Sequence, residues 1–418
     1  MEEAGRSTSL GGNARALVKG GWGFVSFNDT SGLREKVAMA VSQARLVGTE
    51  ASNIAETPPV IEVIKAIVNK DPREVPLADK KALMDEYIEV MWSVSPKIQT
   101  TRVNYGDAHR VVYFGNSFGS YIEQEKVDIT GSFMAMARDG DVVQQGFHST
   151  GSPSDYRGME GLHGKIREAA ERAVRLLSAA PPKGGEYTVV LDPKLAGVFV
   201  HEAFGHLSEA DFVYENPRLK ELLVIGKRFG EKHLNIVDGA AIPGLRGSYQ
   251  YDDEGTPART TYLIREGILV GRLHSRETAA KMGEPPSGNA RALDYHYPPI
   301  VRMTNTGIEQ GTATLEDMIS DIEEGVYAQQ SFGGETRMEM FTFSAGEAYM
   351  IRKGKLAEPI RGVLLSGNIF ATLADIDAIG NDVEWAQGGG CGKGAQSPLP
   401  VGTGSPHIRI RRCVVGGR

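Results

Sequence analysis

The chain of 418 residues has little of several things that would point to particular protein classes. Its only cysteines are Cys391 and Cys413, too few for the disulfide framework of a small secreted protein. No stretch approaches roughly 18 uninterrupted apolar residues, and residues 1–14 are polar and glycine-rich. The net charge of -7 supplies no basic field for nucleic acid or acidic lipid. We therefore expect a cytoplasmic protein whose partners include neither nucleic acid nor membrane.

What is present is the composition of a soluble globular protein, with 41% hydrophobic and 24% charged residues. The length is typical of two domains. Helical and strand patterns alternate through the first half, whereas the second half shows mainly short strands and turns, in keeping with 51 glycines in the chain. The break at Pro181-Pro182-Lys183-Gly184-Gly185 separates the two halves. The prediction is an α+β protein, with an α/β N-terminal domain over 1–183 and a β-rich C-terminal domain over 184–418.

Local patterns predict several elements in the first half. A hairpin is expected over 14–28 with Gly20 and Gly21 at its turn, followed by a helix that Ser31 caps and that runs to about residue 47. Strands are expected between residues 98 and 136. Further helices are predicted over 60–68, 77–94 and 158–179.

The most informative stretch is His201-Glu202-Ala203-Phe204-Gly205-His206. Zinc peptidases commonly place two histidines four residues apart on a helix with a glutamate between them. Here the offset is five, which turns a regular α-helix by about 500° and leaves the imidazoles roughly 140° apart. A shared ion therefore requires a π-bulge or a distortion at Gly205.

The flanking sequence predicts that the motif lies on a buried helix. Residues 187–191 are typical of a buried strand, and Asp192 followed by Pro193 is the pattern of a helix N-cap with proline in the first turn. The next residues are apolar nearly all round. Three ionisable side chains inside such a helix are costly unless they have a role. A buried histidine pair satisfied by backbone carbonyls remains the alternative.

A third metal ligand is suggested by Cys391, which lies among the glycines of the segment 388–394. A cysteine on such open or closely approached backbone suits a thiolate that reaches a metal. An incidental loop cysteine is the alternative. Cys413 lies in a strand-like stretch and is interpreted as a packing residue.

Several motifs together resemble one known family. Besides the helix motif they are Met303-Thr304-Asn305-Thr306-Gly307, Tyr251-Asp252-Asp253-Glu254-Gly255, Cys391-Gly392-Lys393 and Val414-Val415-Gly416-Gly417. They resemble the TldD/PmbA metalloprotease family, and the similarity extends from Gly20-Gly21-Trp22-Gly23-Phe24 onward.

The resemblance implies two domains, an α/β one and a β-rich one, and a groove that accepts unfolded peptides. By position, His201, His206 and Cys391 match the zinc ligands, and Glu202 matches the general base. Because this chain keeps the motif, it resembles the catalytic, TldD-like type, which implies a homodimer or a heterodimer with a PmbA-like paralogue.

The expected function is a zinc-dependent peptidase for short or unfolded peptides, with zinc-bound water as nucleophile and Glu202 as general base. The alternative is a non-hydrolytic peptide-binding partner subunit with a structural metal. A cysteine hydrolase using Cys391 leaves Glu202 without a role.

The sequence allows more than one role for two groups of charged residues. The acidic residues Asp252, Asp253 and Glu254 could support a metal ligand or a substrate amine, or form a solvated turn. Lys393 could pair with the Cys391 thiolate or a substrate carboxylate, or be solvated.

Overall fold

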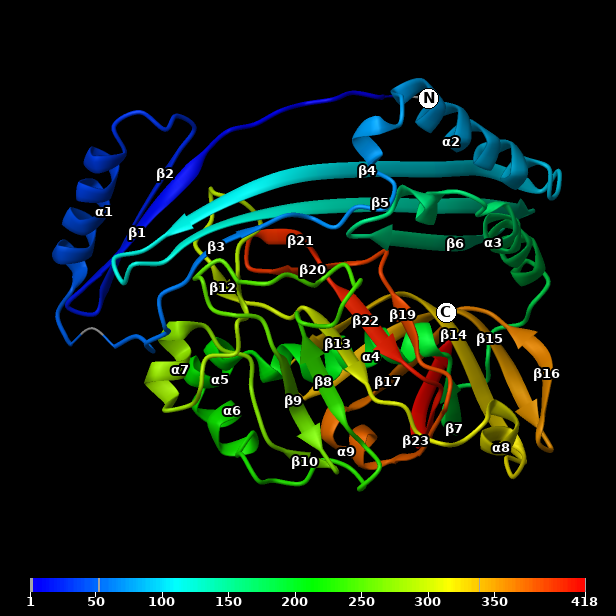
Figure 1. The fold of residues 1–418 in the computed structure, drawn as a ribbon. Coiled ribbons are helices and arrows are strands. Elements are labelled where there is room, and N and C mark those ends of the chain that lie inside the picture. The colour runs from blue at the N-terminus through cyan, green and yellow to red at the C-terminus, as the bar shows by residue number, and fades with distance from the viewer. Residues whose placement is uncertain (1–2, 52, 338, 418) are drawn as a thin grey trace.

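The computed structural model describes residues 3–51, 53–337 and 339–417. It confirms the predicted α+β class. A long, thin sheet lies over a larger β-rich body, and an N-terminal hairpin with its helix stands at one end (Figure 1).

The N-terminal hairpin consists of β1 (Gly12–Val18) and β2 (Gly21–Phe27), followed by α1 (Leu33–Val47). The turn residues are Lys19 and Gly20, with φ of 49° and 76°, rather than the expected Gly20 and Gly21. Gly23 lets α1 pack closely, since a Cβ there would lie 1.9 Å from the carbonyl oxygen of Ala40. The expected Ser31 cap is wrong, because the Ser31 hydroxyl bonds to Asp29 and Gly32 precedes the helix.

The long sheet is built around β5 (Tyr121–Asp139), with β4 (Ile98–Gly115) along one edge and β6 (Val142–Ser152) and β3 (Ile61–Ile64) along the other. The helix predicted over 60–68 is wrong, because this segment adds to the sheet as β3, parallel to the start of β5. The remaining elements here are η1 (Pro72–Glu74), α2 (Leu77–Trp92), η2 (Tyr156–Met159) and α3 (His163–Leu176).

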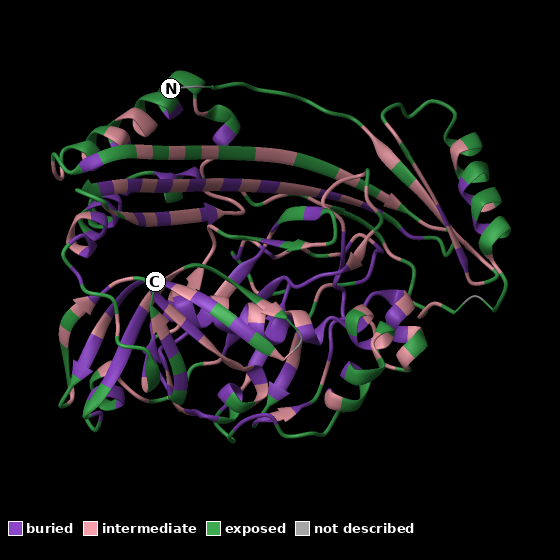
Figure 2. Ribbon diagram, turned by 180° about the vertical axis from the view of Figure 1, so that it is seen from behind, coloured by how far each residue is buried: buried purple, intermediate pink, exposed green. Residues whose placement is uncertain are grey.

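Helices α2 and α3 pack on β5 in a single apolar cluster that includes Tyr87, Phe133 and Ile166. Along much of β5 every second residue is buried (Figure 2). The N-terminal half thus has its own small core.

The larger body contains a seven-stranded sheet in which the pairing of β14 with β15 closes β14, β7, β23, β17 and β15 into a ring. Strands β16 and β18 attach outside that ring. The strand bounds are β7 (Gly185–Leu191), β14 (Glu324–Arg337), β15 (Met340–Arg352), β16 (Lys355–Ile360), β17 (Val363–Asn368), β18 (Ile376–Ile379) and β23 (Ile408–Gly417).

A second sheet has the order β10-β9-β8-β13-β22-β19, and two small hairpins pair β11 with β12 and β20 with β21. The strand bounds are β8 (Ile236–Gly239), β9 (Thr260–Arg265), β10 (Ile268–Leu269), β11 (Ala290–Arg291), β12 (Ile300–Val301), β13 (Asn305–Ile308), β19 (Glu384–Ala386), β20 (Gly390–Lys393), β21 (Gln396–Pro400) and β22 (Gly402–Ser405). The helices of this half, apart from two short turns described below, are α4 (Pro193–Val200), α5 (Ala210–Glu215), α6 (Pro217–Leu222), α7 (Arg276–Met282), α8 (Leu315–Ile319) and α9 (Ile369–Ala374).

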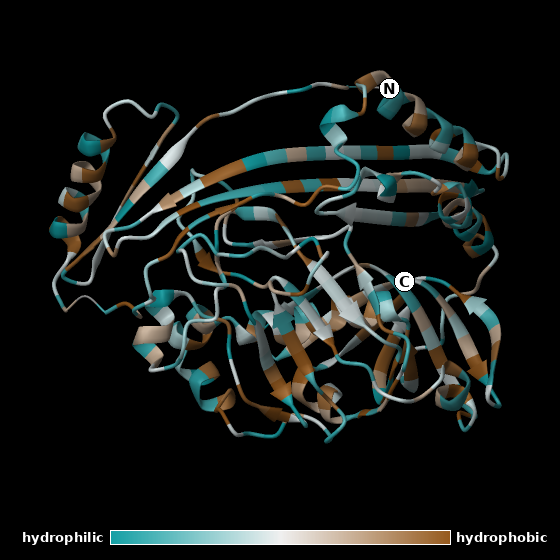
Figure 3. Cartoon of the chain, viewed as in Figure 1, coloured by the Kyte–Doolittle hydropathy of each residue, from teal (hydrophilic) through white to brown (hydrophobic). Residues whose placement is uncertain are grey.

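Helix α4 contacts both large sheets and is the centre of the main core. Phe199 packs edge-on against Phe341 and Phe343 of β15, at centroid distances of 5.4 and 5.9 Å. On its other side Gly197 lies against β22, where a Cβ would come within 3.1 Å of Thr403. Apolar residues concentrate in this body (Figure 3).

The predicted boundary at residue 183 lies in the segment that joins α3 to β7. Arg172 and Arg175 of α3 bind the buried Glu347 of β15 across it. The division into two domains stays a prediction. None of the helices in the described residues is long and apolar enough to cross a membrane.

Candidate metal centre

The helix that carries the histidine motif begins as the sequence predicts. The Asp192 side chain accepts a hydrogen bond from the Leu195 amide at 2.8 Å, and Pro193 occupies the first turn. Apolar residues hold α4 inside the core. The histidine motif therefore directly follows a buried helix with a capped N-terminus.

The expected departure from α-helical geometry is confirmed. After Val200 the chain forms a π-helical turn, η3 (His201–Gly205), and then a 3₁₀ turn, η4 (His206–Ser208). The His206 amide donates to the His201 carbonyl, five residues back instead of four. Gly205 permits this turn to pack, since a Cβ there would lie 2.1 Å from the sulfur of Met303.

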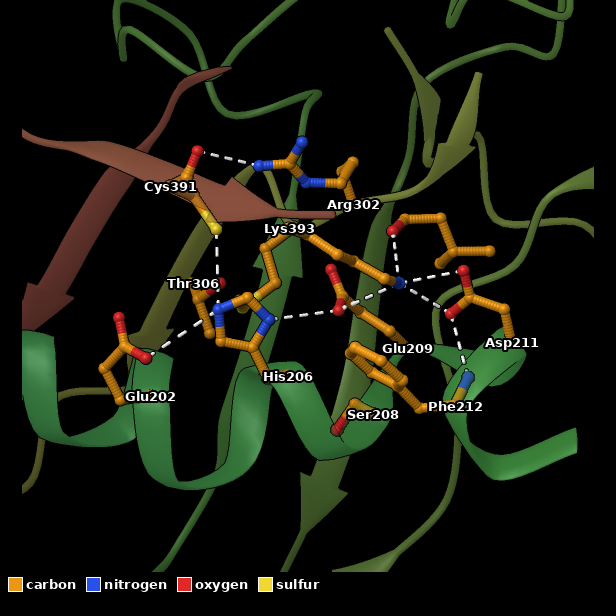
Figure 4. Close-up of polar contacts among 12 residues, drawn as sticks. Glu202, His206, Ser208, Glu209, Asp211, Phe212, Arg302, Thr306, Cys391 and Lys393 are labelled. Carbon is orange, nitrogen blue, oxygen red and sulfur yellow. Dashed lines mark hydrogen bonds and ion pairs between the residues drawn. The ribbon is translucent and has the colours of Figure 1, made fainter. Parts of the chain in front are cut away.

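This turn and β20 bring His201, His206 and Cys391 together. One donor atom from each lies within 4.8 Å of the others. The Cys391 Sγ lies 3.5 Å from the His206 Nε2 (Figure 4). Tetrahedral zinc with bonds of about 2.1 and 2.3 Å holds neighbouring nitrogen and sulfur ligands about 3.6 Å apart, so this spacing suits a shared ion.

Glu202 lies beside this group without belonging to it. Its carboxylate is 3.7 Å from the His206 Nε2, and its side chain is 28% exposed. It is not part of the set of mutually close donor atoms. A carboxylate that is near the donors and open to solvent is placed to bind a water rather than to complete the ligand set.

The electrostatics of the three donors favour a deprotonated sulfur. Burial raises the pKa of Cys391, but its contacts with His201 and His206 outweigh burial and lower that pKa to about 5. For His206 the signs are reversed. Burial lowers its pKa, but the contacts with Cys391 and Glu209 outweigh burial and raise that pKa to about 10. The thiolate, the form that binds metals, is thus stabilised near neutral pH.

The residues present fit a zinc ion. Two imidazoles and one thiolate are a donor set that zinc accepts. The buried His201 Nδ1 has no hydrogen-bond partner among the described residues. The partners of His206 are the side chains of Cys391 and Glu209. The alternative of a histidine pair satisfied by backbone carbonyls therefore does not describe this site.

Two residues that the sequence analysis did not single out hold the site in place. Arg302, which is fully buried, donates to the carbonyl oxygens of Cys391 at 2.8 Å and of Gln396 at 3.2 Å, one on each strand of the β20–β21 hairpin. Glu209 bonds to the His206 Nδ1 at 3.0 Å. For Glu209 the sequence did offer a signal, because residues three apart in a helical segment lie on the same face and His206 precedes Glu209 by three.

Lys393 neither pairs with the Cys391 thiolate nor is solvated. Its Nζ is 3.1 Å from Glu209 and 2.7 Å from Asp211, and its side chain is buried. Both expectations for Lys393 in the free protein were wrong.

Two carboxylates of the acidic loop 252–254 are buried and hydrogen-bonded to neighbouring segments. The Asp252 carboxylate accepts backbone hydrogen bonds from Glu254, Thr256 and Ala290, and burial raises its pKa to about 8. Glu254 accepts from Arg15 of the N-terminal hairpin and from the Arg276 amide. A solvated turn is therefore wrong for these two carboxylates. Asp253, which is half-buried, accepts from the Ala292 amide.

Cys413 lies in β23 within the main core, as predicted for a packing residue. Burial raises its pKa to about 12. It stays a neutral thiol and is separate from the three clustered donors.

The chain is similar to proteins of known family along its length. Three domains of the PmbA/TldA metallopeptidases match: domain 1 over 1–44, the central domain over 70–177 and the C-terminal domain over 184–417. A metalloprotease from Synechocystis sp. is 52% identical, covering 100% of this chain and 90% of that protein. A zinc metalloprotease TldD homolog from Saccharolobus solfataricus is 30% identical, covering 97% and 90%.

Solved structures share the fold. TldE from Thermococcus kodakarensis superimposes with a TM-score of 0.72 at 18% identity, covering 96% of this chain and 89% of that one. A structure from Thermotoga maritima gives a TM-score of 0.78 at 20% identity, covering 96% and 88%. At such identities the likeness speaks for the fold alone. The names of the sequence relatives support a metallopeptidase. The chain belongs to the PmbA/TldD metallopeptidase family, as its motifs predict.

Proposed function

We propose that this protein is a zinc peptidase that hydrolyses short or unfolded peptides. His201, His206 and Cys391 would hold the metal, and Glu202 would act as general base. The observation that carries the proposal is the convergence of these three donors within 4.8 Å beside the partly exposed Glu202 carboxylate.

A zinc ion held by these three residues would supply Lewis-acid chemistry for a peptide carbonyl and for water. Glu202 takes a proton from the attacking water and returns it to the leaving amine. The Glu202 side chain is partly exposed, which lets its carboxylate reach a water, while its backbone is part of the π-helical turn. Arg302 keeps the Cys391 carbonyl, and with it the thiolate, in place.

A cysteine hydrolase is less well supported. The Cys391 side chain is only 3% exposed, so its sulfur is poorly placed to attack a substrate carbonyl. That mechanism also leaves Glu202 and the second histidine without a role. The peptide-binding subunit with a structural metal differs in one observable, because it would retain zinc and show no hydrolysis.

Removing the metal is expected to abolish peptide cleavage. Without it the three donors supply no Lewis acid, and only a thiolate and imidazoles remain. The measurement is the rate of cleavage of a fluorogenic peptide before chelation, after chelation, and after return of stoichiometric zinc. We expect loss and then recovery. Full activity in protein shown to be free of metal would remove zinc from the mechanism.

We expect unfolded chains to be cleaved and compact domains to be spared. In the described part of the chain β20, which carries Cys391, pairs only with β21, so its other edge can receive an extended peptide through main-chain hydrogen bonds. A folded substrate must first open locally, at a free-energy cost of up to its global stability.

The test digests one stable protein and a destabilised variant of the same sequence at a temperature where only the variant is unfolded. Cleavage of the variant alone is expected. Equal rates for the two would show that the site does not select unfolded chain.

The assembly that the resemblance implies is also proposed here, as a homodimer or a heterodimer with a PmbA-like paralogue. Helix α1 exposes several large apolar side chains, as interfaces do. They are Leu33, Val37, Met39, Leu46 and Val47.

A further inference from the structure

Glu209 is a fully buried carboxylate next to the proposed metal site. It has 0% exposure and lies between η4 and α5, three residues after His206. Its Oε2 accepts a hydrogen bond from the His206 Nδ1 at 3.0 Å, while its Oε1 has no partner among the described residues. Burying a carboxylate is costly, so a carboxylate with one oxygen on a histidine needs a compensating cation.

That cation is Lys393, two residues after Cys391 on β20. Its Nζ lies 3.1 Å from the same Glu209 oxygen, and it donates to Asp211 at 2.7 and 2.8 Å and to the Val301 carbonyl at 2.9 Å. The Nζ also stands over the Phe212 ring, 4.1 Å from its centroid. Four groups from α5, β12 and the preceding turn thus hold one ammonium inside the protein (Figure 4).

These contacts join the two elements that carry the metal ligands. His206 bonds to Glu209, Glu209 to Lys393, and Lys393 is on the same short strand as Cys391. Glu209 also orients the His206 ring, because the hydrogen bond at Nδ1 turns the Nε2 atom toward the Cys391 sulfur, where it could bind an ion.

We propose that Glu209 and Lys393 are positioning residues for the metal centre, which orient His206 and fix the separation of His206 from Cys391. The inference rests on the proposed zinc site. In this role Glu209 and Lys393 raise the affinity of the site for zinc and do not contact the substrate.

Replacing Glu209 with Ala should weaken zinc binding by about 10–100-fold, the effect typical of carboxylates that support a ligating histidine. Glu209→Gln keeps an acceptor oxygen and loses the charge, so its affinity should lie between those of the parent and Glu209→Ala. Lys393→Met should also weaken zinc binding, although the Lys393 ammonium contacts none of the three proposed metal ligands directly. Its effect should largely disappear in the Glu209→Gln background, because the two act through one contact.

The readout is the zinc dissociation constant from competition with a chromophoric chelator, with the absorption spectrum of the cobalt-loaded protein as a second probe of ligand geometry. Neither readout depends on activity. The matched control is Glu347→Gln, which also removes the charge of a buried carboxylate, in this case one paired with two arginines, but lies on β15 away from the donors. It should lower stability and leave the zinc affinity unchanged.

The outcomes are distinct. If the parent protein binds zinc and the folded Glu209→Gln and Lys393→Met variants bind it within twofold of the parent, the positioning role is wrong and the proposed function stands. If the parent does not bind zinc, the proposed function fails and this inference with it. Should Glu209→Ala not fold, the two milder variants decide.

Discussion

Replacing Glu202 with Gln is expected to lower kcat/KM for peptide cleavage by at least about 10² while zinc stays bound. The amide keeps the size and shape of the carboxylate and removes only its capacity to accept a proton. Because Glu202 is not one of the mutually close donors, its loss should not empty the site.

The experiment measures kcat/KM and zinc content in the same preparations of Glu202→Gln and parent protein. Glu215→Gln, an exposed glutamate at the end of α5, is the control for a generic loss of charge and should retain parental activity. If the Glu202 variant keeps its zinc and cleaves peptides within about tenfold of the parent, the base lies elsewhere.

Replacing Cys391 with Ala is expected to remove most of the zinc. The change deletes one of three donors and the only thiolate among them, so the loss of affinity should exceed the about 10–100-fold typical of residues that only support a ligand. The two histidines that remain on one turn of helix leave a weak, incomplete site.

The chain contains its own matched control in Cys413. Both cysteines are buried to the same extent, 3% exposed, but Cys413 is a core residue in β23. Cys413→Ala should therefore cost some stability and no zinc. The measurement is zinc per chain by atomic emission after dialysis. A full complement in Cys391→Ala would take Cys391 out of the ligand set and leave the two histidines and another residue to hold the ion.

Much of the local structure could be read from residues near in sequence. The Asp192-Pro193 pair predicts the start of α4, and the five-residue spacing from His201 to His206 predicts the π-helical turn that the structure contains. Both are local, because a helix cap and a helical offset depend on hydrogen bonds between residues three to five apart.

The errors concern segments whose structure depends on distant partners. The apolar spacing over 60–68 suits a helix, but β3 forms because its backbone pairs with residues 121–124 of β5. Local propensity was overridden by hydrogen bonds that span about 60 residues of chain. The expectations for Lys393 are wrong for the same reason, since its acidic partners Glu209 and Asp211 lie about 180 residues earlier in the chain, at the start of α5.

The sequence by itself determined the family, the helix with its histidine motif and the candidate ligands, because these depend on residue identity and short spacings. Only the tertiary structure brought Cys391 to within 3.5 Å of His206, across 185 positions of the chain. It alone also set Glu209 against Lys393 and buried Arg302 beneath the hairpin that carries the cysteine. The packing of whole elements decides which side chains share a buried site. This packing depends on the burial of the entire core, which no single spacing in the sequence specifies.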